Sequence, residues 1–404
     1  MYKAMFIYLV LILLMVNNAN ARPEYAARAK AASCTMCHAS PLGGNIKNAT
    51  GKAFALHGLN INQFSTQDKW AVDFRGLYYS PDHRRANPSG AAIMGATVGV
   101  NLDISDLASG DASKTKTHFV AQHNIGGFSK GGAQEIYLKW QFKEDYEDSF
   151  APQYLMVGRT HRAFGLLTDE HRTYTKMQTA TLWYNHEAGV TVSGNPLNTL
   201  HYDLQLTDGQ NNNAGISDLT TIPYDWAGIA NLRWTPATLP FVLGASYSYH
   251  NNAITNSQSA KAHALYGVVV LDGLTNGIVP WTINMEMVEA SFWNWSLAST
   301  NLLTDPTTTL SGLMDKTSQG YLIQSTITLT NSWELILKLD SLALDKENKG
   351  DRFIRHGIGI KHYLSGAVNI QARYEEAEAK DINQKNSTAV GNEDAFLLLM
   401  RVSL

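Results

Sequence analysis

Two cysteines and a histidine are the residues of this chain whose types and spacing fit a defined chemistry. Cys34 and Cys37 are the only cysteines among 404 residues, and His38 directly follows the second. In a C-x-x-C-H motif, two thioether bonds hold the haem vinyl groups, and the adjacent imidazole ligates the iron from the proximal side. The motif therefore predicts one covalent haem c, attached at Cys34 and Cys37 and ligated by His38.

Two other roles for the cysteine pair fit less well. A structural zinc site needs a second pair of ligands, and the sequence has no further cysteine. A redox-active dithiol is expected beside a β-α-β pattern, which the sequence lacks. Haem attachment is the reading that uses all three residues of the motif.

The ligand on the distal side of the iron is left open by the sequence. His57 is the nearest candidate, at the end of a short helix predicted from Thr50 to Gly58. The alternative is a surface histidine that a helix C-terminus favours through its dipole. Without a distal side chain the iron would be five-coordinate.

The first 67 residues divide into an export signal and a small haem segment. Residues 1–21 carry Lys3, an apolar run and Ala19-Asn20-Ala21, as expected of a cleaved signal peptide. The alternative, a membrane anchor, is disfavoured because the run is shorter than the ~20 residues that span a bilayer. Residues 22–67 are predicted to form a small α-helical haem c segment, in the periplasm or as a plug of the barrel described next. Its helices are expected at 23–32 and 50–58, with a loop at 41–45.

Residues 68–404 alternate between apolar and polar side chains. In residues 134–143, for example, Ile136, Leu138 and Trp140 share one face, and the residues between them are polar or aromatic. Segments of about ten such residues are typical of tilted membrane strands with an apolar outside and a polar inside. Trp226 and Trp234 close the two ends of one apolar face, as expected for two interfacial girdles. The alternative is a soluble β-sandwich or propeller, which also alternates.

Short turns and long polar loops follow each other along this part of the chain, which is the arrangement of outer-membrane barrels. We therefore predict an all-β fold: an antiparallel outer-membrane β-barrel of about 16 strands, with the termini on the periplasmic side. The predicted strands start near Trp70, Met94, Thr115, Ala133, Pro152, Gln178, Thr199, Trp226, Pro240, Lys261, Pro280, Gln319, Ser332, Arg352, Ala367 and Asp394.

Other features narrow the function classes. A formal net charge of -3 gives no polybasic signature, so nucleic acid is not an expected partner. The sequence has no nucleophile elbow and no phosphate-binding loop. Asp169, Glu170 and His171 are a conceivable Fe(II) site, although a solvated loop is the simpler interpretation. Polar side chains expected to face the barrel lumen include Lys139, Asp203, Arg233, Lys338, Arg373 and Arg401.

The order of signal peptide, C-x-x-C-H motif and barrel resembles the fused cytochrome-porins of Fe(II)-oxidising bacteria. Residues 51–58, Gly-Lys-Ala-Phe-Ala-Leu-His-Gly, are similar to a Gly-Arg-x-Phe-Lys-Leu-x-Gly run of that family, whereas the family's Pro-x-Leu-Thr-Pro-Phe stretch is missing. The resemblance implies electron transfer between an extracellular redox species and a periplasmic carrier such as a soluble cytochrome. Fe(II) is the extracellular species that the family favours. The alternatives are a diffusion porin or transporter whose haem segment is a plug or sensor, and a soluble periplasmic haem enzyme.

Overall fold

The computed structural model describes residues 38–40, 43–47, 70–81, 89–105, 115–127, 132–142, 150–166, 173–179, 181, 186–197, 199–209, 224–236, 239–252, 259–271, 280–291, 316–330, 332–348, 352–364, 368–379 and 394–403. The predicted signal peptide and the two predicted helices of the haem segment lie outside these residues.

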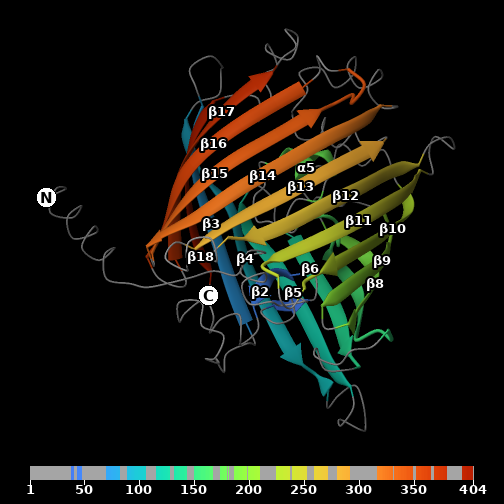
Figure 1. Ribbon diagram of the computed structural model, residues 1–404. Helices are drawn as coiled ribbons and strands as arrows, with labels where there is room; N and C mark the ends of the chain where they lie inside the picture. The colour runs from blue at the N-terminus through green and yellow to red at the C-terminus, as the bar shows by residue number, and fades with distance from the viewer. Residues whose placement is uncertain are drawn as a thin grey trace, which may run out of the picture.

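Sixteen antiparallel strands form a closed barrel in which each strand pairs with its neighbours in the chain (Figure 1). The number of strands and the fold class predicted from the alternation are confirmed. The strands are β3 (Trp70–Pro81), β4 (Gly90–Asp103), β5 (Lys116–Gly127), β6 (Gly132–Gln141), β7 (Tyr154–His161), β8 (His186–Leu197), β9 (Leu200–Thr207), β10 (Tyr224–Trp234), β11 (Phe241–Asn252), β12 (Ala260–Val270), β13 (Trp281–Ser291), β14 (Thr317–Thr330), β15 (Trp333–Ala343), β16 (Arg352–Tyr363), β17 (Val368–Ala379) and β18 (Ala395–Ser403).

Because successive side chains of a strand point to opposite faces, the closed sheet has one face toward lipid and one toward the lumen. On β15, Leu337 and Leu339 point outward and are exposed, whereas Lys338 and Asp340 point inward and are buried. Closure pairs the backbone groups of every strand within the sheet, which a hydrocarbon environment requires. The soluble sandwich and propeller alternatives are thereby excluded. No helix in the described part of the chain is long and apolar enough to cross a membrane.

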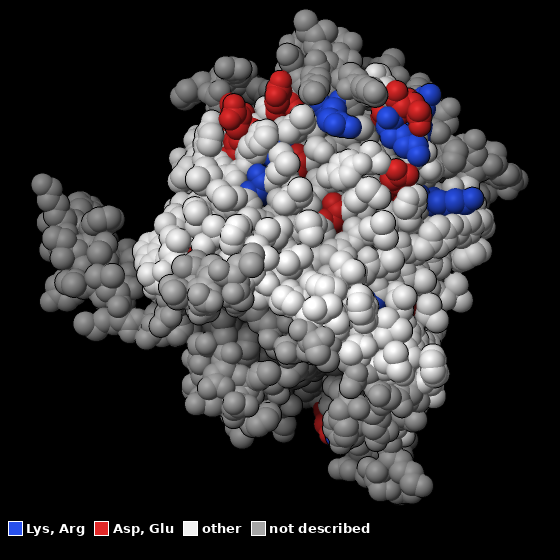
Figure 2. Space-filling view, viewed as in Figure 1, with Lys and Arg blue, Asp and Glu red and all other residues white. Residues whose placement is uncertain are grey.

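The outer surface carries an apolar belt that ends in aromatic side chains. Trp226 and Trp234 are both exposed at opposite ends of β10, with exposed Leu232 between them, so the predicted pair of girdle positions is confirmed. In Figure 2, acidic and basic side chains gather near the top of the view, toward the end where β17 finishes. The described surface beneath them in the same view is largely uncharged. This belt is the surface that contacts lipid.

Strands β3 and β18 form the seam that closes the barrel. They pair antiparallel, with Ser403 opposite Asp73 and Val402 opposite Phe74. Inside the seam, Arg401 Nε donates to Asp73 Oδ2 at 2.7 Å, and Arg75 Nε donates to Asp73 Oδ1 at 2.6 Å. One carboxylate therefore joins the first and last strands of the barrel.

A small hairpin precedes the barrel. β1 (His38–Ser40) pairs antiparallel with β2 (Gly43–Lys47), with His38 opposite Lys47 and Ser40 opposite Gly43. The predicted loop at 41–45 is therefore wrong for residues 43–45, because they begin strand β2. The described residues of the predicted haem segment, 38–40 and 43–47, form this hairpin, and the two helices predicted for the segment stay a prediction.

One predicted strand start is also wrong. Gln178 ends a short helix, α5 (Tyr174–Gln178), and the sixth barrel strand begins at His186. The helix belongs to the connection between β7 and β8. That connection does not stay at the rim of the barrel.

Candidate functional site: a segment across the barrel lumen

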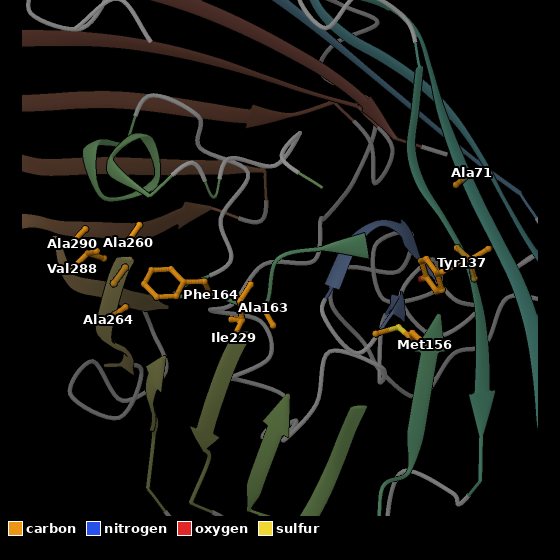
Figure 3. Packing of buried hydrophobic residues seen from close by; sticks show 12 residues of the cluster. Ala71, Tyr137, Met156, Ala163, Phe164, Ile229, Ala260, Ala264, Val288 and Ala290 are labelled. Atoms are coloured by element: carbon orange, nitrogen blue, oxygen red, sulfur yellow. The ribbon is translucent and has the colours of Figure 1, made fainter. Parts of the chain in front are cut away.

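The connection between β7 and β8 enters the barrel. We call its described residues, 162–166 and 173–179, the inner segment. Although the flanking strands are β7 and β8, α5 contacts β13, β14 and β15. Figure 3 shows α5 on the lumen side of these strands, with Phe164 close to Ala264 and Val288. The inner segment therefore crosses the lumen and narrows it.

Backbone amides of the first half bind side chains on successive strands of the inner wall. Ala163 N donates to Gln205 Oε1 of β9 at 2.7 Å, and Gly165 N donates to Ser246 Oγ of β11 at 2.9 Å. Buried backbone donors outside regular structure need such partners. Successive strands of the wall supply these acceptors, first β9 and then β11. The two hydrogen bonds fix the position of residues 162–166 against these strands.

Glu286 on β13 holds both halves of the inner segment. Its Oε1 accepts hydrogen bonds from Leu166 N at 2.6 Å and from Lys176 Nζ at 2.7 Å. Its Oε2 accepts from Thr175 Oγ1 at 2.6 Å. All of these groups are buried, so water does not compete for the carboxylate.

Asp340 on β15 binds the start of α5. Tyr174 N lies 3.1 Å from Asp340 Oδ1 and 3.0 Å from Oδ2. Arg355 of β16 donates to the same carboxylate at 2.5 Å, and its guanidinium lies 4.3 Å from the centre of the Tyr174 ring. At the other end of the helix, Gln178 Nε2 donates to Ser318 Oγ at 2.7 Å.

Arg162 ties the beginning of the inner segment to its end. Its Nη1 donates to the carbonyl oxygen of Thr179 at 2.8 Å, and its Nη2 lies 2.8 Å from His250 Nε2 on β11. Its Nε is 3.5 Å from a carboxylate oxygen of Glu187 on β8. The fully buried guanidinium thus closes the segment into a loop against the wall.

Apolar contacts complete the attachment. Ala163 and Phe164 cluster with Ile229 of β10 and with small side chains of β12 and β13. Leu166 clusters with a second group on β11 and β12. Burying a side chain such as Phe or Leu contributes about 1.5–3 kcal/mol, so these contacts add to the hydrogen bonds.

The wall around β15 to β17 carries a buried group of charges. Lys338, Arg355 and Arg373 lie among Asp340 and Glu375, with Arg373 Nη2 at 3.0 Å from Glu375 Oε1. Three cations against two carboxylates leave one positive charge in excess.

The six side chains predicted for the lumen lie on inner-face positions of their strands: Lys139, Asp203, Arg233, Lys338, Arg373 and Arg401.

The residues of the predicted haem site are only partly described. Cys34, Cys37 and His57 lie outside the described residues, as do Asp169, Glu170 and His171. His38 is the first residue of β1. Within the described part of the chain, no group of three or more His, Cys, Asp or Glu side chains is placed to hold a metal ion.

Sequence reasoning did not find the inner segment or the residues that hold it. Glu286 and Asp340 sit in ordinary alternating strands, where a polar inward residue is expected in any barrel. One signal was available in the sequence. Residues 162–185 interrupt the alternation of apolar and polar residues for longer than a short turn needs, and they include Phe164, Gly165 and Lys176.

No protein-family model and no curated protein sequence matches the chain. Solved structures match its fold. The anion-selective porin from Comamonas acidovorans aligns with 83% of this chain and 98% of its own, at 10% identity and a TM-score of 0.54. The outer membrane channel DcaP of Acinetobacter baumannii aligns with 83% of this chain and 96% of its own, at 10% identity and a TM-score of 0.57. OmpF of Salmonella typhi aligns with 83% of this chain and 96% of its own, at 12% identity and a TM-score of 0.56.

At these identities the likeness concerns the fold. The closed ring of 16 strands and the exposed apolar belt are what a bacterial outer membrane requires of a spanning protein. The chain is a porin-like 16-stranded β-barrel of the bacterial outer membrane.

Proposed function

We propose that the protein is an outer-membrane channel through which small polar solutes cross, with the inner segment setting the width of the pore. The observation that carries this proposal is the attachment of the inner segment to Glu286 and Asp340, far around the ring from the strands that it connects. A segment held this firmly inside a barrel limits the size of solute that passes.

Small anions are the solutes that the described charges favour. The group on β15 to β17 has three cations and two carboxylates, and the seam adds Arg75 and Arg401 against Asp73. An excess of one charge sign in a pore raises the local concentration of the opposite ion. One of the matched structures is described as an anion-selective porin, which agrees with this direction.

Planar bilayer recordings test the proposal. Folded protein should insert with stepwise increases in current, and in a KCl gradient the reversal potential should have the sign of chloride preference. A potential with the sign of potassium preference would contradict the anion assignment. Folded protein that inserts and gives no current steps would contradict the channel itself.

A second candidate function rests on the motif at Cys34, Cys37 and His38. We propose that one haem c is attached there, and that electrons pass between an extracellular donor such as Fe(II) and a periplasmic carrier. When bound, haem supplies a one-electron redox centre. The spacing of the motif and the predicted export signal support this proposal.

Haem staining of a denaturing gel tests the attachment. The unaltered chain should stain, and the double variant Cys34→Ala with Cys37→Ala should lose covalent stain, because each single substitution leaves one thioether in place. Retained stain in the double variant would exclude attachment at this motif.

Electron paramagnetic resonance of a His57→Ala variant decides whether His57 is the distal ligand, since loss of a strong-field ligand changes the spin state of the haem iron.

A further inference from the structure

Apolar side chains on the inner wall of the barrel occur where something covers them. In a water-filled barrel the inner face is polar, since exposed apolar groups there are unfavourable. On β10 to β12, Ile229, Val242 and Val268 face inward and are buried. Their cover is Phe164 and Leu166 of the inner segment.

A second apolar region lies on the other side of the ring. Leu77 of β3, Met94 of β4 and Leu397 of β18 cluster on the inner face, and they are 8%, 3% and 0% exposed. Their chain neighbours Tyr78 and Leu398 are exposed, which identifies the lipid side. Val120 of β5, Tyr137 of β6 and Met156 of β7 are also buried on the inner face, but they belong to the cluster that contains Ala163 and Phe164 of the inner segment.

The inner segment is attached mainly far from this region. One of its anchoring strands, β11, is eight strands from β3 in either direction around the ring of sixteen, so the two lie on opposite sides of the lumen. The second region therefore needs a different cover.

The hairpin of β1 and β2 is in the right place. β2 contacts β3 and β4, the strands that carry Leu77 and Met94. Figure 3 shows the hairpin, in dark blue, on the lumen side of the wall near Tyr137 and Met156. Its sequence, from His38 to Lys47, includes Leu42 and Ile46 and no acidic residue.

We infer that this hairpin is seated inside the barrel on the apolar wall of β18, β3 and β4, and that it occupies lumen space opposite the inner segment. The inference rests on the proposed channel function for its consequence: the N-terminal segment reduces the flow of solute. It also puts the backbone of His38, the last residue of the cysteine motif, within the barrel.

Photo-crosslinking in the full chain tests the position of the hairpin without reference to conductance. A benzoylphenylalanine residue is placed at Met94 or Ala71, on the inner face of the two strands that β2 contacts, and at Ile336 on the inner face of β15 as a matched control. Irradiation should join the first two positions, and not the third, to the peptide that ends at Lys47. Capture of that peptide at neither Met94 nor Ala71 would overturn the inference.

Conductance tests the consequence. A variant in which residues 22–67 are deleted should give channels that conduct several times more than the full mature chain. Equal conductance would overturn the inference while leaving the channel function intact. Folded barrels that conduct in neither form would instead refute the channel function. The variants Met94→Asn and Ile336→Asn provide a pair in which residues 22–67 are retained: only the first should raise conductance.

Discussion

Lys176 Nζ lies 2.7 Å from Glu286 Oε1, and both side chains are buried inside the barrel. The lysine comes from α5 and the glutamate from β13, so the pair joins the inner segment to the wall. A buried ion pair depends on both partners, because removing one leaves the other charged and unpaired.

Replacing Glu286 by Gln should release the inner segment. Loss of one partner of a buried pair costs about 3–5 kcal/mol, and Leu166 and Thr175 lose a charged acceptor as well. Single-channel recordings should show larger and more variable current steps. The double variant Glu286→Gln with Lys176→Met should return toward the original current, since it removes both charges of the pair and leaves neither one unpaired. Unchanged current in the single variant would show that Glu286 does not hold the segment.

Gly165→Ala should displace the inner segment where it packs against Glu286 of the wall. Gly165 has φ of 68°, and a β-carbon there would meet the carboxylate of Glu286. Left-handed backbone costs an L-residue with a side chain about 1–2 kcal/mol, to which the clash adds. Gly90→Ala is the matched control, because nothing lies within 4 Å of the added carbon. The midpoint of heat-induced unfolding on gels should fall for the first variant and not for the second.

Arg162→Met should loosen the end of the inner segment that carries Thr179. The substitution keeps much of the apolar stem and removes the donors to Thr179 and the contact with His250. Hydrogen exchange of the amides in residues 173–179 should become faster. Arg159→Met, three residues earlier on β7 and only partly buried, should leave that exchange unchanged. Equal exchange in the two variants would argue against a role of Arg162 in closing the segment.

Ala230→Arg should destabilise the barrel in lipid. Ala230 faces outward midway between Trp226 and Trp234, and arginine near the middle of a bilayer costs about 2–4 kcal/mol. Gln319→Arg, at the charged end of β14, should cost little because the side chain reaches the headgroups. Guanidinium titrations of the folded protein in vesicles measure both free energies of unfolding. Equal values would mean that Ala230 does not face hydrocarbon.

The barrel strands could be predicted because each carries its own signal. The alternation of Leu337 and Leu339 with Lys338 and Asp340 is a local pattern, and a shift by one residue would place charges in lipid. Fifteen of the sixteen predicted starts lie within a few residues of the observed ones. The exception, Gln178, lies where the pattern is set by contacts with distant strands.

The inner segment could not be predicted in this way. Gly165 and Ser246 are 81 positions apart in the sequence, and Tyr174 and Asp340 are 166 apart. No periodicity within residues 162–185 indicates that their partners lie across the lumen. Glu286 and Asp340 are equally hidden, because an inward carboxylate on a barrel strand is ordinary. The haem site at Cys34, Cys37 and His38 stays a prediction from the motif.

The seam between β3 and β18 has a consequence for how the protein is made. Arg401 and Asp73 are separated by 328 positions, so their contact cannot form until almost the whole chain is in place. Contacts of such high sequence separation slow folding, because the entropy of closing the long loop is lost before the contact compensates for it. Until then β3 and β18 both present unpaired edges that can bind other strands. The protein should therefore depend on assembly machinery that shields these edges, and charge reversal at Asp73 should delay closure.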